Sequence, residues 1–157
     1  MADELIASMV VGANWASSVH GSSAGLRSEE DRSRFLALRR SPEIAALLVG
    51  GATVEVEPYR KSPHPLFIFD RRINASLREY VAQIKESING TILCEGGVRL
   101  IHLLLSENLI DSFHLSRVNI EGDDHFLDSS LLHRGLSLIS SEIVGATTFE
   151  RYERASR

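Results

Sequence analysis

The sequence predicts an α/β fold with a central mixed, mostly parallel sheet that is flanked by helices and closed by an antiparallel hairpin. Short apolar segments typical of buried strands alternate with longer segments in which apolar residues recur at helical spacing. Two apolar segments end in paired glycines, Gly50-Gly51 and Gly96-Gly97, which suit strand-to-helix turns. Near the end, Leu136–Val144 and Thr147–Tyr152 are predicted strands of a hairpin.

The composition is that of one globular domain across residues 1–157. The chain is 43% hydrophobic and 24% charged, which allows a single buried core. Its formal net charge of −4 gives no basic field for nucleic acid or an anionic membrane, so we expect a small-molecule partner.

Two features bear on where the protein works. No apolar run approaches the length of a membrane span, and the N-terminus lacks the pattern of a signal peptide, which predicts a cytoplasmic protein. Cys94 is the only cysteine, so no intrachain disulfide can form. Its position within an apolar strand predicts a buried small side chain rather than a nucleophile.

The first predicted strand, Leu5–Val11, leads into a loop rich in Gly, Ser and Ala. Residues 12–26 have the composition of a loop that closes over a ligand or of one that is simply flexible. Trp15, the only tryptophan, could stack on a flat heterocycle or anchor the core. Ser28 and the acidic residues after it predict the start of a helix that ends at Arg39.

Ile44–Val49 and Leu66–Phe69 are the next predicted strands. Ligands of open α/β sheets gather at the carboxyl ends of such strands, which is where Gly50-Gly-Ala-Thr53 forms the first glycine turn. Ser76, with Glu79 three residues later, predicts the start of another helix.

The most informative segment is Thr91–Leu105, in which a strand, the turn Glu95-Gly96-Gly97 and an apolar helix follow one another. Adjacent glycines let a ligand approach the backbone, and the helix start offers free N–H groups and a positive dipole end. A phosphate would suit this turn, although a Gly-Gly pair can equally be a tight joint. Because neither G-x-G-x-x-G nor G-x-x-x-x-G-K-[ST] occurs, Rossmann and P-loop sites are rejected.

After Asn108, a plausible helix stop, Ser112–Ile120 is a predicted strand and Glu121–Phe126 a polar loop. Asp123, Asp124 and His125 of this loop are a weak metal candidate. None of the six histidines has a partner at the spacing of a ligand pair, so no metal is predicted.

Three stretches resemble one protein family. They are Met9–Leu26, Ala46–Tyr59 and Cys94–Ser116, and they are similar to the reductase domain of bacterial riboflavin biosynthesis, the 5-amino-6-(5-phosphoribosylamino)uracil reductase-like family. The closing Thr148–Tyr152 is similar to the last strand of that family. The resemblance implies the fold of dihydrofolate reductase. It also implies a shortened, actinobacterial-type member, because two strands that the family places before the equivalent of Ser76 are missing here.

The resemblance implies NADPH-dependent reduction of a ribosylaminopyrimidine, with hydride moving from the nicotinamide to C1′ of the opened ribose. It places the cofactor at the two glycine turns. The implied cofactor-binding residues are Gly50, Gly51, Thr53, Gly96, Gly97 and Val98. The implied catalytic residues are Asn14 and Glu95, and the implied substrate-binding residues are Ser23 and Arg39.

Departures from the family leave alternatives open. Asn14 stands where the family has Asp, and Trp15 replaces a Gly. A non-catalytic nucleotide-binding or dimerisation domain and a reductase with another substrate are therefore both alternatives. Arg39 could instead interact with its own helix dipole, and Glu95 could be a structural carboxylate at a strand end.

Two further expectations concern surfaces. The shortened sheet should leave apolar edge surface, so we expect a homodimer. The missing strands should leave the adenosine side of the nucleotide site open, while the pyrophosphate contacts at the glycine turns are kept.

Overall fold

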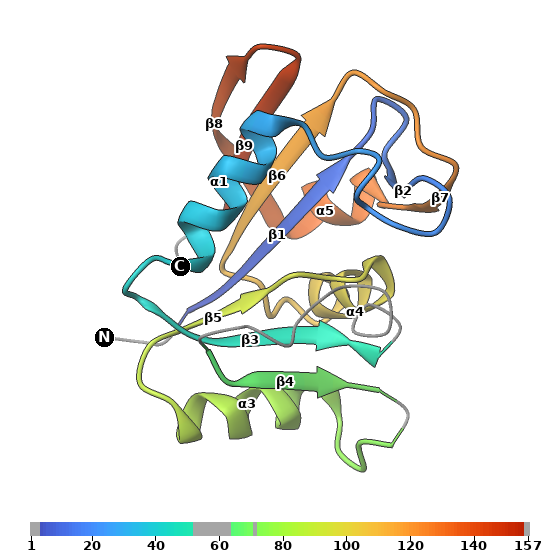
Figure 1. The fold of residues 1–157 in the computed structure, drawn as a ribbon. Coiled ribbons are helices and arrows are strands. Elements are labelled where there is room, and N and C mark those ends of the chain that lie inside the picture. Colours follow the sequence, from blue (N-terminus) through green and yellow to red (C-terminus); the bar gives the residue numbers. More distant parts are fainter. Residues whose placement is uncertain (1–3, 52–63, 71, 156–157) are drawn as a thin grey trace.

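The computed structural model describes residues 4–51, 64–70 and 72–155, and its centre is a seven-stranded sheet in the order β4-β3-β5-β1-β6-β9-β8 (Figure 1). The strands are β1 (Leu5–Val11), β3 (Ile44–Gly50), β4 (Leu66–Phe69), β5 (Thr91–Cys94), β6 (Ser112–Val118), β8 (Leu136–Val144) and β9 (Thr147–Arg154). The strands from β4 to β6 are parallel, whereas β9 is antiparallel to both β6 and β8. The predicted mostly parallel sheet with a C-terminal hairpin is confirmed.

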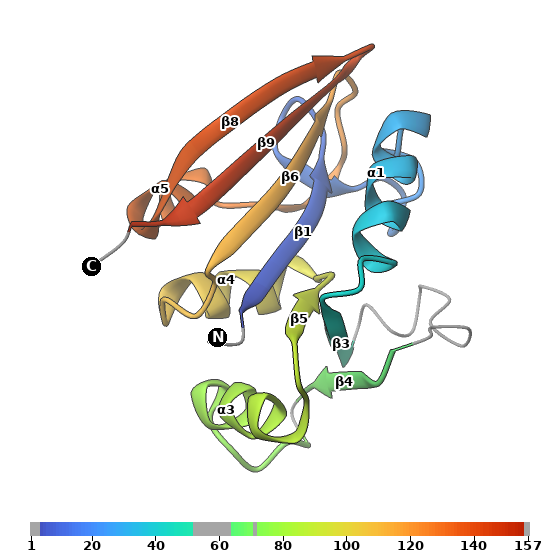
Figure 2. The same ribbon diagram turned by 90° about the vertical axis from the view of Figure 1, so that its left-hand side faces the viewer.

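Helices cover both faces of the sheet. The helices are α1 (Glu29–Arg39), α3 (Leu77–Ser87), α4 (Val98–Ser106) and α5 (Ser129–Gly135). Helix α1 lies on one face, and the larger hydrophobic core joins the other face to residues of α3, α4 and α5 (Figure 2). Side chains of β1 alternate between the two faces, so Leu5 and Ala7 enter the larger core while Ile6 packs on the α1 side. None of the described helices is long and apolar enough to cross a membrane.

Both predicted helix starts are confirmed by their caps. The Ser28 hydroxyl accepts a hydrogen bond from the Asp31 N–H at 3.0 Å, and the Ser76 hydroxyl accepts one from the Glu79 N–H at 3.1 Å. Each cap satisfies a backbone N–H that has no partner inside its helix. These local bonds explain why the sequence was sufficient to place the starts of α1 and α3.

The sequence prediction missed three short elements. Within the predicted loops 12–26 and Glu121–Phe126, the structure has strands β2 (Ala16–Ser18) and β7 (Asp124–Phe126), which pair antiparallel with each other. A three-residue strand is too short to show an alternating pattern, so the pairing partner decides it. Helix α5 was also missed, although Asp128 caps it by accepting from the Ser130 and Leu131 N–H groups.

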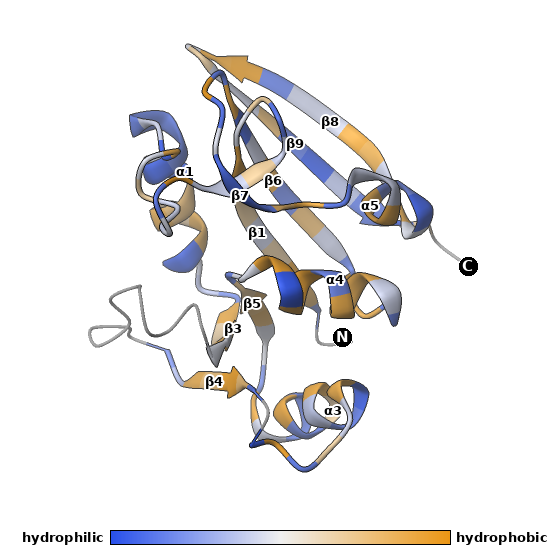
Figure 3. Ribbon diagram, turned by 90° about the vertical axis from the view of Figure 1, so that its right-hand side faces the viewer, coloured by the Kyte–Doolittle hydropathy of each residue, from blue (hydrophilic) through white to orange (hydrophobic). Residues whose placement is uncertain are grey.

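The two outer strands of the sheet are β4 and β8. From β4 the chain reaches α3 through residues 70–76, and the described part of this connection contains no further strand. At the other edge, β8 is exposed along most of its length and carries apolar side chains, as the hydropathy colours show (Figure 3). Ile143 is 76% exposed and Ile139 is 50% exposed. Apolar edge surface is therefore present, on β8.

Candidate functional site

The two glycine turns lie next to each other at one edge of the sheet. Strand β5 pairs in parallel with both β3 and β1, so the carboxyl ends of these strands face the same way (Figure 1). The Gly50 N–H donates to the Gly96 carbonyl at 2.9 Å, which joins the turn after β3 to the turn after β5. After β1 the chain passes through α1 toward β3, whereas after β5 it passes through α4 to β6. The two connections leave the neighbouring strands β1 and β5 in opposite directions, so the switch point at which ligands of open α/β sheets bind borders the Gly96-Gly97 turn after β5.

The N-terminus of α4 points its free backbone N–H groups into this edge. Gly97 is the N-cap, no side chain caps the helix, and its first turn contains no acidic residue. The first N–H groups of a helix have no partner within it and carry its positive dipole end, so they suit an anion. Arg99, an exposed residue of this first turn, makes no ion pair with any described residue and adds positive charge; sequence analysis overlooked it.

The glycines keep the space before α4 open. A Cβ at Gly50 would lie 3.7 Å from the Gly97 nitrogen and 3.8 Å from the Leu100 Cβ. Gly96 has φ +103, a conformation that glycine adopts without strain. A side chain at Gly50 would therefore occupy the position from which a ligand reaches the Gly97 N–H. Gly51, next along the chain, has Asp70 beside it, with 3.0 Å between the Asp70 Cβ and an added Cβ.

Arg39 and Glu95, predicted as separate substrate-binding and catalytic residues, form one ion pair. The Arg39 Nε donates to one Glu95 carboxylate oxygen at 2.8 Å, and its Nη2 donates to the other at 2.5 Å. The Glu95 side chain is only 2% exposed and that of Arg39 is 20% exposed. The Phe35 ring lies under the guanidinium, 4.7 Å from ring centroid to Cζ. This arrangement fixes the carboxylate directly before the Gly96-Gly97 turn.

Asn14 fastens two loops together through both ends of its amide. Its Nδ2 donates to the Gly122 carbonyl at 2.9 Å, and its Oδ1 accepts from the Gly122 N–H at 3.1 Å. The same oxygen also accepts from the Ala16 N–H at 3.3 Å. The loop after β1 is thus tied to the connection between β6 and β7. The family resemblance implied a catalytic Asn14, whereas the role seen here depends on a partner 108 residues away that no local pattern indicates.

We expect Asn14→Asp to lower the free energy of unfolding by about 1–3 kcal/mol. The substitution removes the Nδ2 donor and places a carboxylate oxygen opposite the Gly122 carbonyl, which leaves two acceptors facing each other. Urea unfolding followed by circular dichroism measures the change. Asn74→Asp, at an exposed amide, is the matched control and should leave stability within about 0.5 kcal/mol. Equal losses of stability in Asn14→Asp and Asn74→Asp would contradict the role of Asn14 in holding the two loops together.

Trp15 is anchored in the structure rather than left open as a stacking surface. The Arg117 guanidinium lies over its ring at 4.7 Å, and the His133 ring meets it edge-on with centroids 6.5 Å apart. Its ring is half-buried against the larger core. Of the two predicted roles, the structure favours the core anchor.

The remaining predicted residues fall outside this group or outside the described residues. Cys94 is fully buried, and burial followed by the charge of Glu95 raises the pKa of its thiol to about 12, so it stays protonated at neutral pH. Ser23 lies in the turn before Leu26, whose N–H donates to the Ser23 carbonyl at 3.0 Å. Thr53 lies outside the described residues. Within the described ranges, no three His, Cys, Asp or Glu side chains are placed to hold a metal ion.

Solved structures share the fold of this chain. No protein-family model matches the chain, and no curated protein matches it in sequence. A diaminohydroxyphosphoribosylaminopyrimidine deaminase/5-amino-6-(5-phosphoribosylamino)uracil reductase from Thermotoga maritima superposes with a TM-score of 0.76 at 12% identity. The match covers 98% of this chain but only 57% of the Thermotoga chain.

Two other structures match over nearly their whole length. A dihydrofolate reductase from Enterococcus faecalis, complexed with NADP(H) and RAB-propyl, has a TM-score of 0.65 at 18% identity over 98% of this chain and 97% of its own. A pyrimidine reductase-like protein from Corynebacterium diphtheriae has a TM-score of 0.68 at 14% identity over 99% and 93%. At these identities the likeness establishes the fold, which is that of dihydrofolate reductase.

Proposed function

We propose that this chain is an NADPH-dependent reductase of a ribosylaminopyrimidine. The observation that carries the proposal is the uncapped N-terminus of α4, which faces the side-chain-free Gly50 where the carboxyl ends of β3 and β5 meet. A pyrophosphate needs such a set of free N–H groups together with close backbone approach. The structural neighbours that have this fold include a pyrimidine reductase-like protein and a dihydrofolate reductase complexed with NADP(H), which supports the choice of chemistry and cofactor.

The residues of this chain mainly bind and orient. The N–H groups at the start of α4 and the exposed Arg99 would hold the phosphates, and Gly50 and Gly96 would admit them. When bound, the reduced nicotinamide supplies the hydride. The Glu95 carboxylate is almost fully buried and both of its oxygens are held by Arg39, so Glu95 fixes the Gly96-Gly97 turn and orients the reacting partners through it. A site of this kind needs positioning more than charged catalytic groups.

The direct experiment combines cofactor binding with turnover. Purified protein is titrated with NADPH and with reduced nicotinamide mononucleotide, and the loss of NADPH absorbance is followed with the ribosylaminopyrimidine and with dihydrofolate. We expect weak NADPH binding, a similar affinity for the mononucleotide, and turnover of the ribosylaminopyrimidine only. Tight NADPH binding with loss of affinity for the mononucleotide would contradict the open adenosine side. Cofactor binding without turnover of either substrate would favour a non-catalytic nucleotide-binding domain.

Gly50→Ala tests the phosphate position without disturbing the fold. Its methyl group would make only ordinary contacts, the nearest at 3.7 Å, so we expect stability to stay unchanged or to rise slightly. The same methyl would displace a ligand oxygen from the Gly97 N–H, so NADPH affinity should fall about tenfold or more. Isothermal titration calorimetry measures the affinity. Gly135→Ala, in α5, is the matched control and should bind NADPH like the wild type.

We also propose that the protein is a homodimer in which a second copy covers β8. An exposed edge strand offers unpaired N–H and C=O groups, and the apolar side chains of β8 would be buried by an antiparallel neighbour. Strand β8 is the last strand of the sheet order, so its outer edge is accessible to a partner (Figure 2).

Ile143→Glu should convert this dimer to a monomer. The substitution places a charge on the most exposed apolar side chain of β8, at 76% exposure, where an interface would have to bury it. Light scattering across a concentration series measures the mass. Ile120→Glu, at an apolar residue that is 52% exposed beyond the end of β6, should leave the dimer intact. A wild type that stays monomeric at high concentration would refute the proposal.

A further inference from the structure

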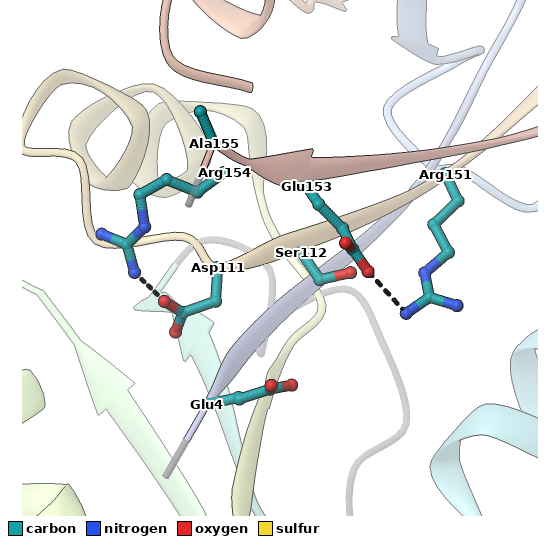
Figure 4. A pocket seen from close by; sticks show the side chains of 7 residues that line it. All are labelled: Glu4, Asp111, Ser112, Arg151, Glu153, Arg154 and Ala155. Carbon is teal, nitrogen blue, oxygen red and sulfur yellow. Dashed lines mark hydrogen bonds and ion pairs between the residues drawn. The ribbon is translucent and has the colours of Figure 1, made fainter. Parts of the chain in front are cut away.

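A cavity of about 430 Å³ lies at the edge of the sheet opposite to the glycine turns. Its lining includes Glu4, Asp111, Ser112, Arg151, Glu153 and Arg154 (Figure 4). Glu4 directly precedes β1, and Ser112 is the first residue of β6. These are the amino ends of parallel strands whose carboxyl ends face the candidate nucleotide site. The cavity is therefore a separate place on the molecule, and its interpretation does not rest on the reductase proposal.

The charges that line the cavity do not balance. Arg154 pairs with Asp111, and the Arg151 Nη2 donates to the Glu153 Oε1 at 2.8 Å. Glu4 makes no ion pair with any residue that the structure describes. The lining therefore has one carboxylate more than it has guanidinium groups.

His114, which lies on the same face of β6 two residues beyond Ser112, does not restore the balance. Burial, and then the charges of Arg151 and Arg34, lower the pKa of His114 to about 4, so it is neutral at pH 7. The arginines do not leave unmatched positive charge either, since Arg34 approaches Glu142 at 3.9 Å and Arg151 is bonded to Glu153. Among the residues that the structure describes, the uncompensated charge in this region is that of the exposed Glu4 carboxylate.

Ser112 presents a polar group that lacks a partner. The residue is only 4% exposed, and its hydroxyl oxygen is buried without a hydrogen-bond partner among the described residues. A buried polar atom in this state costs stability unless something else satisfies it. The register pairs Ser112 with Ile6 on β1 and with Glu153 on β9. Side chains two residues apart on a strand share a face, so Glu4, Ser112 and Glu153 all lie on one face.

We propose that this cavity binds the primary ammonium group of a small organic amine. An ammonium group carries three N–H donors and no acceptor, and the cavity offers the Glu4 carboxylate, the Ser112 hydroxyl and the Glu153 carboxylate as acceptors. The positive charge compensates Glu4, and the Ser112 hydroxyl gains its missing partner. A divalent metal ion is less suited, because the described carboxylates and histidines include no group of three placed to hold one.

Calorimetric titration of the full chain with four probes at equal ionic strength tests the proposal. The probes are butylamine, tetramethylammonium, butyrate and magnesium chloride. We expect saturable binding of butylamine alone, because tetramethylammonium carries the same charge without N–H donors. Equal binding of tetramethylammonium or magnesium would show a diffuse charge effect and overturn the proposal. Binding of butyrate in place of butylamine would overturn it in favour of an anion site at Arg151.

Two variants locate the binding. Glu4→Gln should weaken butylamine affinity about tenfold, because it removes a charge-assisted hydrogen bond. Glu121→Gln, at an exposed glutamate in the connection between β6 and β7, is the matched control and should have no effect. Ser112→Ala should weaken the affinity about threefold while the melting temperature stays the same or rises, since an unsatisfied hydroxyl is removed. Unchanged affinity in both Glu4→Gln and Ser112→Ala would place the amine elsewhere and refute this site.

Discussion

Glu95→Gln should lower the free energy of unfolding by about 3 kcal/mol or more, one of the two largest losses we expect from a single substitution outside the hydrophobic core. The Glu95 carboxylate is almost fully buried and receives two hydrogen bonds from Arg39, whose side chain is itself mostly buried. Removing the charge of Glu95 leaves the guanidinium without its counter-ion in a place that water reaches poorly. Urea unfolding measures the loss.

A double-mutant cycle identifies the cause. Arg39→Met alone should also destabilise, whereas the combination Glu95→Gln with Arg39→Met should cost clearly less than the sum of the single changes, because no unpaired charge remains. Glu142→Gln is the control, since its ion pair with Arg34 is long and exposed and should contribute less than about 1 kcal/mol. Additive losses in the cycle would mean that Glu95 and Arg39 act independently.

The single variant Glu95→Gln also separates the two roles proposed for Glu95, in the fold and in catalysis. If the carboxylate serves only the fold, Glu95→Gln should bind NADPH as the wild type does at a temperature where both are folded. If it also orients the reacting groups, turnover should fall while cofactor affinity is kept, because the interaction would act in the transition state. The comparison of turnover with affinity is thus the readout that a purely structural role would not change.

Gly122→Ala should destabilise the protein by more than about 2 kcal/mol, because no space exists for the added methyl group. An ideal Cβ at Gly122 would lie 2.5 Å from the Ser18 carbonyl oxygen and 2.6 Å from the Ala16 Cβ. Both atoms belong to β2, so relief requires that the connection before β7 move away from β2, where the Asp123 N–H is bonded to the Ser18 carbonyl at 3.0 Å. Gly12→Ala, which would meet the Ile120 carbonyl, should behave in the same way.

Thermal unfolding with a matched glycine substitution checks this prediction. Gly50→Ala introduces the same methyl group where contacts are ordinary and should leave the melting temperature unchanged or higher. A Gly122→Ala protein as stable as Gly50→Ala would show that the connection at Gly122 moves away from β2 at little cost. Because Asn14 is bonded to Gly122, that result would also mean that the loop after β1 is held less firmly than its hydrogen bonds indicate.

The sequence alone was sufficient for elements whose signals are local. A buried strand such as Leu5–Val11 is a continuous apolar run, and a helix start such as Ser76 is recognised from the cap residue and the residues just after it. The glycine turns were also found from sequence, since two adjacent glycines between a strand and a helix have few other uses. The alternation of strands and helices predicted the α/β class, and the resemblance to known reductases narrowed it to the fold of dihydrofolate reductase, which the structure confirms.

Tertiary structure decided what each polar side chain does. Glu95 and Arg39 are 56 residues apart, and Asn14 is 108 residues from Gly122, so no local pattern shows that either pair exists. The same holds for β2 and β7, whose pairing joins Ala16 to Phe126. These strands are too short to show an alternating sequence pattern. Apolar periodicity reports which face of an element is buried, because burial of any apolar neighbour satisfies it. A carboxylate or amide instead needs one particular partner at hydrogen-bonding distance. Only the tertiary structure determines which residue that partner is.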